Sequence, residues 1–306
     1  MLEGQRILVT GATGQVARVL AEKLNGRNDV FAAARFRDAK QKKELEDLGI
    51  GTVVLSIGEA DLSSAPDVDY VFHCAANTYP QTNEEGFLHN AEGVGFLMQR
   101  YRGVKGFLHM SSSSVYRVST GMREPVAEDH NLGGHSAYSP PYAMSKLAGE
   151  AVVRFQARAL SLPTVITRLD VAYGSRGHGG VPMILYEMMK GGQTYTRAEV
   201  GDSYCSLIHE DDIAEQCENL IQSAVAVPAR TVNLGGDEPT SVEEIIAYIE
   251  SLTGLSMKTQ SGPEDTWGMK VLDNRLRREL GGPCKVTWKE GVRRSIAARY
   301  PEAVRD

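Results

Sequence analysis

A tyrosine and a lysine four positions apart could carry out acid–base chemistry in this 306-residue chain. Tyr142 and Lys146 follow Pro140 and Pro141, which suit the first turn of a helix, so both side chains share one helix face. A free tyrosine has a pKa of about 10, but an ammonium group one turn away favours the phenolate and lowers that pKa. A hydroxyl from the serine run at residues 111–114 could hold a substrate oxygen beside the phenol. Because this spacing is also common on exposed helix faces, the pair gains weight only from its surroundings.

A glycine turn near the start of the chain could bind a dinucleotide. Residues 7–9 form the short apolar run that is typical of a buried parallel strand, and an apolar-periodic helix follows. Gly11 permits a tight turn, Gly14 lets a pyrophosphate approach, and Ala17 lets the helix pack closely on the strand. Free N–H groups and the helix dipole then point at one spot. The predicted cofactor contacts here are Gly11, Thr13, Gly14, Gln15 and Val16.

The end of the second predicted strand, over residues 29–34, bears on which dinucleotide binds. NAD sites place a carboxylate on the free 2′-hydroxyl at this position, but here Ala34 is followed by Arg35. A guanidinium can grip a 2′-phosphate, so we predict a preference for NADP(H), with NAD(H) as the alternative cofactor. Another interpretation is that Arg35 belongs to a solvated basic run. Further predicted cofactor contacts are Asp61 and Leu62 in a loop, Ala75 and Ala76 at the end of a fourth strand over residues 69–76, and Tyr142 and Lys146.

Strand and helix signals alternate through residue 170, which predicts an α/β fold: a Rossmann-type, doubly wound parallel sheet. Ligands bind such sheets at the carboxyl ends of the strands, where the glycine turn and the serine run both lie. Further on, Ser241 and Glu244 predict a capped helix over residues 241–252. The glycine- and arginine-rich loop at residues 174–180 is expected near the substrate, and residues 255–306 read as polar and loop-rich.

Composition excludes several classes of protein. A net charge of −6 and a pI of about 5.7 argue against nucleic acid or an anionic membrane as the main partner. The chain has no apolar run of transmembrane length and no signal-peptide pattern, so we expect a cytoplasmic protein with a small-molecule substrate. The four scattered cysteines have no metal-ligand spacing, and no metal site is predicted.

These motifs resemble those of the extended short-chain dehydrogenases/reductases, which include nucleotide-sugar epimerases and dehydratases. The resemblance covers nearly the whole chain, at residues 10–17, 61–62, 73–76, 90, 111–116, 142–146, 168–174, 209–212 and 233–236. It implies a catalytic set of Ser112, Tyr142 and Lys146, and a homodimer packed through two helices per subunit. It also implies a Rossmann domain over residues 1–170 and a smaller substrate domain over residues 171–306, from which residues near 205–240 return to the sheet. Candidate substrate-binding residues are Ser113, Arg176 and His178.

Three departures from the family pattern bear on the substrate. Val171 stands where many sugar-nucleotide enzymes have asparagine, and Cys205 stands where they often have an arginine for the diphosphate. Ser113 and Ser114 replace the Asp-Glu pair of the dehydratases. We therefore predict an NADP(H)-dependent carbonyl reductase or alcohol dehydrogenase with a small or medium non-nucleotide substrate. The alternatives are a nucleotide-sugar epimerase and a non-catalytic dinucleotide sensor, which would not need the catalytic set.

Overall fold

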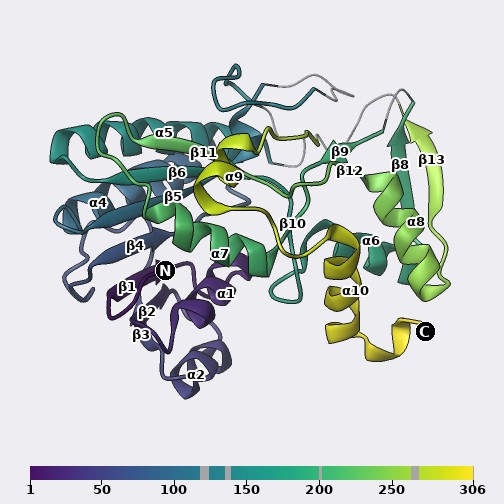
Figure 1. Ribbon diagram of the computed structural model, residues 1–306, viewed down its shortest axis with the longest axis horizontal. Coiled ribbons are helices and arrows are strands. Elements are labelled where there is room, and N and C mark those ends of the chain that lie inside the picture. Colours follow the sequence, from purple (N-terminus) through teal and green to yellow (C-terminus); the bar gives the residue numbers. More distant parts are fainter. Residues whose placement is uncertain (118–123, 135–138, 200–201, 263–268, 306) are drawn as a thin grey trace.

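A parallel sheet forms the larger, left-hand part of the computed structural model in Figure 1, which describes residues 1–117, 124–134, 139–199, 202–262 and 269–305. Its strand order is β11-β6-β5-β4-β1-β2-β3, and each neighbouring pair is parallel. The strands are β1 (Arg6–Thr10), β2 (Asp29–Ala34), β3 (Gly51–Val54), β4 (Tyr70–His73), β5 (Gly106–Ser112), β6 (Thr164–Leu169) and β11 (Arg230–Leu234). The chain moves outward from β1 to β3 and then crosses to β4, so the order reverses between β1 and β4. This confirms the predicted doubly wound Rossmann-type α/β fold.

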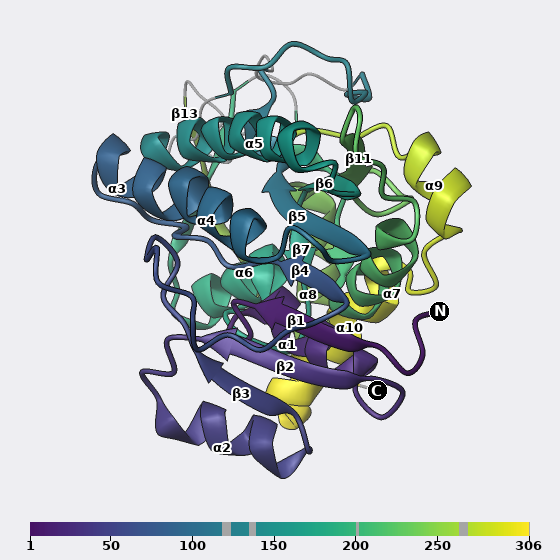
Figure 2. The same ribbon diagram turned by 90° about the vertical axis from the view of Figure 1, so that its left-hand side faces the viewer.

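Helices cover both faces of the sheet (Figure 2). Alternate strand residues point to opposite faces, so Leu8 joins the core under α4 and α5 whereas Ile7 and Val9 join the core under α1 and α7. Val153 of α5 and Leu20 of α1 are fully buried in these two cores. The helices are α1 (Gln15–Leu24), α2 (Ala39–Asp47), α3 (Asn83–Phe87), the π-helical turn η1 (Leu88–Glu92), α4 (Gly93–Arg100), α5 (Pro140–Leu160) and α7 (Glu210–Ile221).

A separate apolar core lies at the other end of the molecule, on the right of Figure 1. Tyr195, Ile245 and Ile296 are buried in it, on β8, α8 and α10. Its elements are β7 (Ala172–Tyr173), α6 (Gly180–Lys190), β8 (Thr194–Ala198), β9 (Tyr204–Cys205), β10 (Ile208–His209), β12 (Thr240–Ser241), α8 (Val242–Thr253), β13 (Lys258–Gly262) and α10 (Trp288–Arg299). The remaining helical segments are η2 (Ser113–Val115), α9 (Arg275–Gly281) and η3 (Pro301–Ala303). Within the described residues, every helix is too short or too polar to span a bilayer.

Several elements differ from the sequence-based expectation. The fourth strand ends at His73 rather than at residue 76, and the backbone beyond it packs closely on Gly11, where a Cβ would lie 2.8 Å from the Cα of Ala75. Residues 255–306 contain α9 and α10, although they read as loop-rich. The capped helix is confirmed: Ser241 and Glu244 exchange both hydrogen bonds of a capping box at the start of α8.

Candidate active site

The glycine turn between β1 and α1 forms an open cradle of backbone. Gly11 has a φ of +77°, and a Cβ there would lie 2.8 Å from the Cα of Ala75, so a larger residue would clash with the end of β4. Gly14 caps α1 without a side-chain hydrogen bond, which leaves the first amide groups of the helix for a ligand. The buried Nε2 of Gln15 has no partner among the described residues. These features fit the diphosphate of a dinucleotide, with Thr13 and Val16 half-buried beside it.

The other predicted cofactor residues lie at neighbouring strand ends. Ala75 and Ala76 follow β4 and border the cradle through the contact of Ala75 with Gly11. Arg35 follows β2 and is exposed. Asp61 is exposed, and hydrogen bonds from Ser63, one of them from its backbone N–H at 3.0 Å, lower the pKa of its carboxyl group.

Leu62 differs from Asp61, because its side chain is buried in the core under α4 and α5. It therefore offers a ligand its backbone rather than its side chain. The contacts of Arg35, Asp61 and Leu62 with a cofactor stay predictions.

The proposed catalytic residues lie where β5 ends and α5 begins. Tyr142 is half-buried in the first turn of α5, after two prolines. Lys146 is buried, and its Nζ donates a hydrogen bond of 2.7 Å to the carbonyl of Met110 on β5. Ser112 is the last residue of β5, and its Oγ accepts a hydrogen bond of 3.2 Å from the backbone N–H of Ser114. The structure thus brings the lysine against the strand that presents the serine.

Burial lowers the pKa of Lys146 to about 8, although the nearby Glu150 raises it. The ammonium form is therefore sensitive to the charges around it near neutral pH. Glu150 lies one turn further along α5 and accepts hydrogen bonds from Ser111 and Arg168. Sequence reasoning singled out Lys146 but gave Glu150 no role.

Ser113 is held by a carboxylate at the end of β6. Its Oγ donates a hydrogen bond of 2.6 Å to Oδ1 of Asp170, whose Oδ2 accepts one of 2.8 Å from the backbone N–H of Ser206. Burial raises the pKa of Asp170, against the lowering effect of Lys270 and these hydrogen bonds. Asp170 and Lys270 were missed from the sequence. Asp170 lies in the segment 168–174 that carries the family resemblance and at the carboxyl end of a predicted strand, but it was given no role.

The loop at residues 174–179, which we call the strap, lies against the cofactor cradle. A Cβ on Gly177 would lie 3.1 Å from the backbone nitrogen of Gln15, at the start of α1. Arg176 forms an ion pair of 3.0 Å with Glu22 of the same helix. Nδ1 of His178 accepts a hydrogen bond of 3.1 Å from the backbone N–H of Gly180. The candidate substrate residues Arg176 and His178 thus already have partners within the protein, and their contact with a substrate stays a prediction.

Two residues far along the chain hold the strap. Oε1 of Glu210 accepts hydrogen bonds from the N–H and hydroxyl of Ser175 at 2.8 and 2.9 Å, and Oε2 accepts one from the N–H of Arg176 at 3.2 Å. Arg299 of α10 donates to the carbonyls of Ser175, Arg176 and Gly177. No local sequence pattern could have paired these residues with the strap.

Two residues that depart from the family pattern, Val171 and Cys205, stand where related enzymes often have polar side chains for the substrate. Val171 is half-buried in the smaller core. Cys205 is fully buried and directs its Sγ to the carbonyl of Thr240 at 3.5 Å, and burial raises the pKa of its thiol well above the usual value. Neither residue offers a charged hydrogen bond to a substrate.

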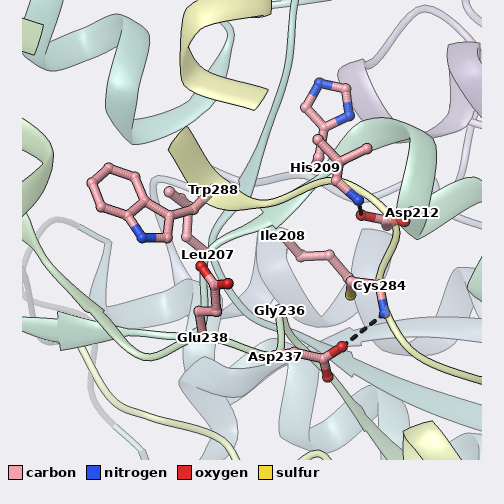
Figure 3. Close-up of a pocket in the computed structure, with 10 residues that line it drawn as sticks. Leu207, Ile208, His209, Asp212, Gly236, Asp237, Glu238, Cys284 and Trp288 are labelled. Atoms are coloured by element: carbon pink, nitrogen blue, oxygen red, sulfur yellow. Dashed lines mark hydrogen bonds between the residues drawn. The ribbon is translucent and has the colours of Figure 1, made fainter. Parts of the chain in front are cut away.

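A small cavity of about 50 Å³ lies between β10 and the segment that follows α9 (Figure 3). Asp237 accepts a hydrogen bond of 2.8 Å from the N–H of Cys284, and Asp212 accepts bonds from the N–H groups of Lys285 and Val286 at 2.8 and 3.0 Å. Since both carboxylates accept hydrogen bonds from backbone N–H groups of the protein, we interpret the cavity as a structural junction.

Comparison with known proteins places the chain in a family. The family model described as "NAD dependent epimerase/dehydratase family" matches residues 7–235. A Bacillus subtilis (strain 168) protein named as an uncharacterized UDP-glucose epimerase is 27% identical, over 86% of this chain and 88% of its own length. A UDP-N-acetyl-alpha-D-glucosaminuronate decarboxylase of Bacillus cytotoxicus is 25% identical, over 95% and 97%.

Solved structures support the same fold. The UDP-glucuronic acid 4-epimerase of Bacillus cereus, solved with UDP-glucuronic acid and NAD, superposes with a TM-score of 0.80 at 22% identity, covering 96% of this chain and 98% of that one. The family match spans the cradle, the end of β5, the start of α5 and most of the strap's contacts. The chain therefore belongs to the NAD-dependent epimerase/dehydratase family and is an enzyme of the extended short-chain dehydrogenase/reductase type.

Proposed function

We propose that the chain is an NAD-dependent epimerase that inverts a hydroxyl-bearing carbon of a nucleotide-linked sugar. The observation that carries this proposal is the strap, which lies against Gln15 and is bonded by both Glu210 and Arg299. An epimerase must keep one dinucleotide through oxidation and re-reduction, whereas a reductase must exchange it in every turnover. A strap anchored from two elements favours retention of the dinucleotide.

The residues at the ends of β5 and α5 supply the acid–base chemistry. A bound nicotinamide dinucleotide supplies a reversible hydride acceptor. Tyr142 takes the proton of the substrate hydroxyl during oxidation and returns a proton during reduction, which is general acid–base catalysis. The ammonium group of Lys146 stabilises the tyrosine phenolate, and Ser112 holds the oxygen of the keto intermediate. Inversion follows when the keto sugar presents its other face before reduction.

The names of the relatives support this choice over the reductase that the sequence favoured. The Bacillus subtilis relative carries a UDP-glucose epimerase name, and the Bacillus cereus neighbour was solved with NAD and a UDP-sugar. We infer that NAD is the cofactor and that UDP-sugars are the first substrates to test. The NADP(H) preference inferred from Ala34 and Arg35 has no support from these relatives.

One observation favours a second candidate, an NADP(H)-dependent reductase of a non-nucleotide substrate. Cys205 is fully buried, so this position gives a substrate diphosphate no charged partner. The two candidates differ at Arg35, which is exposed and could reach a 2′-phosphate.

For the epimerase we expect Arg35→Ala to leave NAD affinity within about twofold of wild type, because NAD has no 2′-phosphate for Arg35 to bind. Fluorescence titration with NAD and NADPH measures both affinities. A loss of about tenfold or more that is confined to NADPH, in a wild-type protein that binds NADPH more tightly than NAD, would favour the reductase.

Retention of the dinucleotide tests the strap directly. We expect the purified protein to keep bound NAD through gel filtration, and Arg299→Ala to lose most of it, because the variant removes the hydrogen bonds from α10 to three carbonyls of the strap. Arg293→Ala on the same helix is the matched control and should retain NAD. Mass spectrometry of the protein-bound fraction gives the dinucleotide content. Equal retention by both variants would remove the strap as support for an epimerase.

We also propose a homodimer that uses the outer face of α5. Met144 and Phe155 are 51% and 67% exposed and lie three helical turns apart, on one side of the helix. The proposal rests on the family resemblance, and these two side chains mark the face of α5 that a partner subunit would cover. The domain boundary near residue 170 and a cytoplasmic location likewise stay predictions.

A further inference from the structure

A buried ion pair lies directly behind the proposed catalytic residues. Glu150 of α5 and Arg168 of β6 both have side chains that are 2% exposed. Oε1 of Glu150 accepts a hydrogen bond of 2.9 Å from Nε of Arg168, and Oε2 accepts one of 2.8 Å from Nη2. This two-point contact fixes the guanidinium and the carboxylate in one plane. The pair thereby ties α5 to the strand next to β5.

The same helix face holds two consecutive residues of β5. Nζ of Lys146 bonds the carbonyl of Met110 at 2.7 Å, and Oε1 of Glu150 accepts a bond of 2.7 Å from Oγ of Ser111. Ser112 is the next residue of the strand. Lys146 and Glu150 are one helical turn apart and both bond β5, and Tyr142 precedes Lys146 by one turn of the same helix. Two hydrogen bonds one turn apart thus hold the end of β5 against the helix that carries Tyr142.

Arg168 is itself held in place on its far side. Its Nη1 donates a hydrogen bond of 2.9 Å to the carbonyl of Glu128, and its guanidinium lies 4.7 Å from the centre of the Tyr116 ring. The hydroxyl of Tyr116 in turn donates to Oδ1 of Asn233 at 2.6 Å. A buried pair of this kind adds little net stability relative to apolar residues, so its position beside the site calls for another explanation.

We propose that the Glu150–Arg168 pair is a positioning device for catalysis: Glu150 fixes Ser112 against Tyr142 through Ser111 and keeps the Lys146 ammonium charged. Neither residue touches the substrate. The assignment rests on the proposed function insofar as Tyr142, Lys146 and Ser112 are the catalytic set.

Three titratable groups near Lys146 are neutral, so they do not offset the effect of the Glu150 charge on the lysine. His73 of β4 stacks on His109 of β5 at 5.4 Å between ring centres, and burial lowers the pKa of His73 to about 3 and that of His109 well below normal. Burial raises the pKa of Cys74, after β4, to about 12. These three groups are uncharged at neutral pH, and Tyr142 precedes Lys146 by one turn on α5.

Glu150 itself is a carboxylate at neutral pH. Burial raises its pKa, but the hydrogen bonds and charge of Arg168, together with the Ser111 hydroxyl, outweigh burial and lower the pKa overall. Its negative charge in turn raises the pKa of Lys146 against the effect of burial. Loss of that charge would therefore favour the neutral amine of Lys146.

The test uses Glu150→Gln, which keeps the shape and an acceptor for Ser111 but removes the charge. The readout is an NMR titration of the ¹³C-labelled ε-carbon of Lys146 in protein saturated with NAD. The signal of Lys146 is assigned by its disappearance in Lys146→Arg. We expect the titration midpoint to fall by about one pH unit. Arg154→Gln is the matched control: Arg154 also lies near Glu150, at 3.6 Å, but is 41% exposed, so its loss should move the midpoint by less than about 0.3 unit.

Ser111→Ala tests the positioning role without changing any charge. It removes the hydrogen bond from β5 to Glu150, and it leaves the charges of Glu150 and Arg168 in place. We expect kcat to fall about tenfold with KM within about threefold and the Lys146 midpoint unchanged. An unchanged midpoint in Glu150→Gln would overturn the electrostatic role, and an unchanged kcat in Ser111→Ala would overturn the positioning role. If no sugar nucleotide is isomerised, the proposed function fails, but the Lys146 titration still decides the role of Glu150.

Discussion

Replacement of Tyr142 by phenylalanine is expected to reduce turnover by about 100-fold or more while NAD remains bound. The phenylalanine ring fills the same half-buried space in the first turn of α5. The cradle between β1 and α1 should therefore not change. Only the hydroxyl that exchanges a proton with the substrate is lost. Turnover is measured by chromatography of the substrate and product sugars, and bound NAD by mass spectrometry.

Tyr248→Phe is the matched control, since Tyr248 lies on α8 in the smaller core and packs edge-on against Trp288. It should turn over at the wild-type rate. Near-normal turnover by Tyr142→Phe would show that another group transfers the proton. Tyr138 would then be the next residue to replace, although it lies outside the residues that the structure describes.

Replacement of Lys146 by methionine is expected to lower both turnover and NAD affinity, with turnover reduced by about 1,000-fold. Methionine fills the buried volume, but it removes the ammonium charge and the hydrogen bond to the carbonyl of Met110. Turnover and NAD titration are measured as for Tyr142→Phe. Lys43→Met on the exposed face of α2 removes a surface ion pair with Asp47 and is the control for loss of a lysine. Wild-type kinetics in Lys146→Met would refute the assignment.

The pH dependence of the wild-type enzyme follows from the same lysine. Burial lowers the pKa of Lys146 to about 8, so its charged form is present below that pH and is lost as the pH rises through it. If catalysis needs the ammonium group, kcat falls on the alkaline side of pH 8 or so. A kcat that stays constant up to pH 10 or so would indicate that the charge of Lys146 is not required.

Local sequence signals predicted the parts of the fold that depend on neighbouring residues. The strand Asp29–Ala34, the turn at Gly11 and the capping box of Ser241 each have a cause within a few residues, and the structure contains all three. The serine run likewise marked the end of β5, and the prolines before Tyr142 marked the start of α5. These short-range causes were sufficient to indicate the fold class and the candidate site.

Long-range contacts could not be predicted in this way. Glu210 and Arg299 hold the strap from positions far along the chain, and Asp170 meets Ser113 across two strands. The helix α10 carries few apolar residues, and Trp288, Val292 and Ile296 pack it on the smaller core. Its sequence therefore read as loop.

The chemical class of the substrate was the property that the sequence predicted least well. Val171 and Cys205 pointed away from a nucleotide sugar, because each removes a polar contact that the family often has. A missing side chain shows only that one contact is absent and does not show what replaces it. The relatives favour the epimerase, and the buried Lys270, which lowers the pKa of Asp170, is a basic residue that neither departure takes into account.

The most direct test of the proposed function is an NMR assay of the purified protein with UDP-glucose or UDP-glucuronic acid and no added dinucleotide. The anomeric proton signals of the sugar report the ratio of the two 4-epimers over time. We predict that the ratio moves to equilibrium while the absorbance of reduced nicotinamide shows no net change. No isomerisation of either sugar, together with stoichiometric consumption of added NADPH by a simple carbonyl compound, would contradict the account.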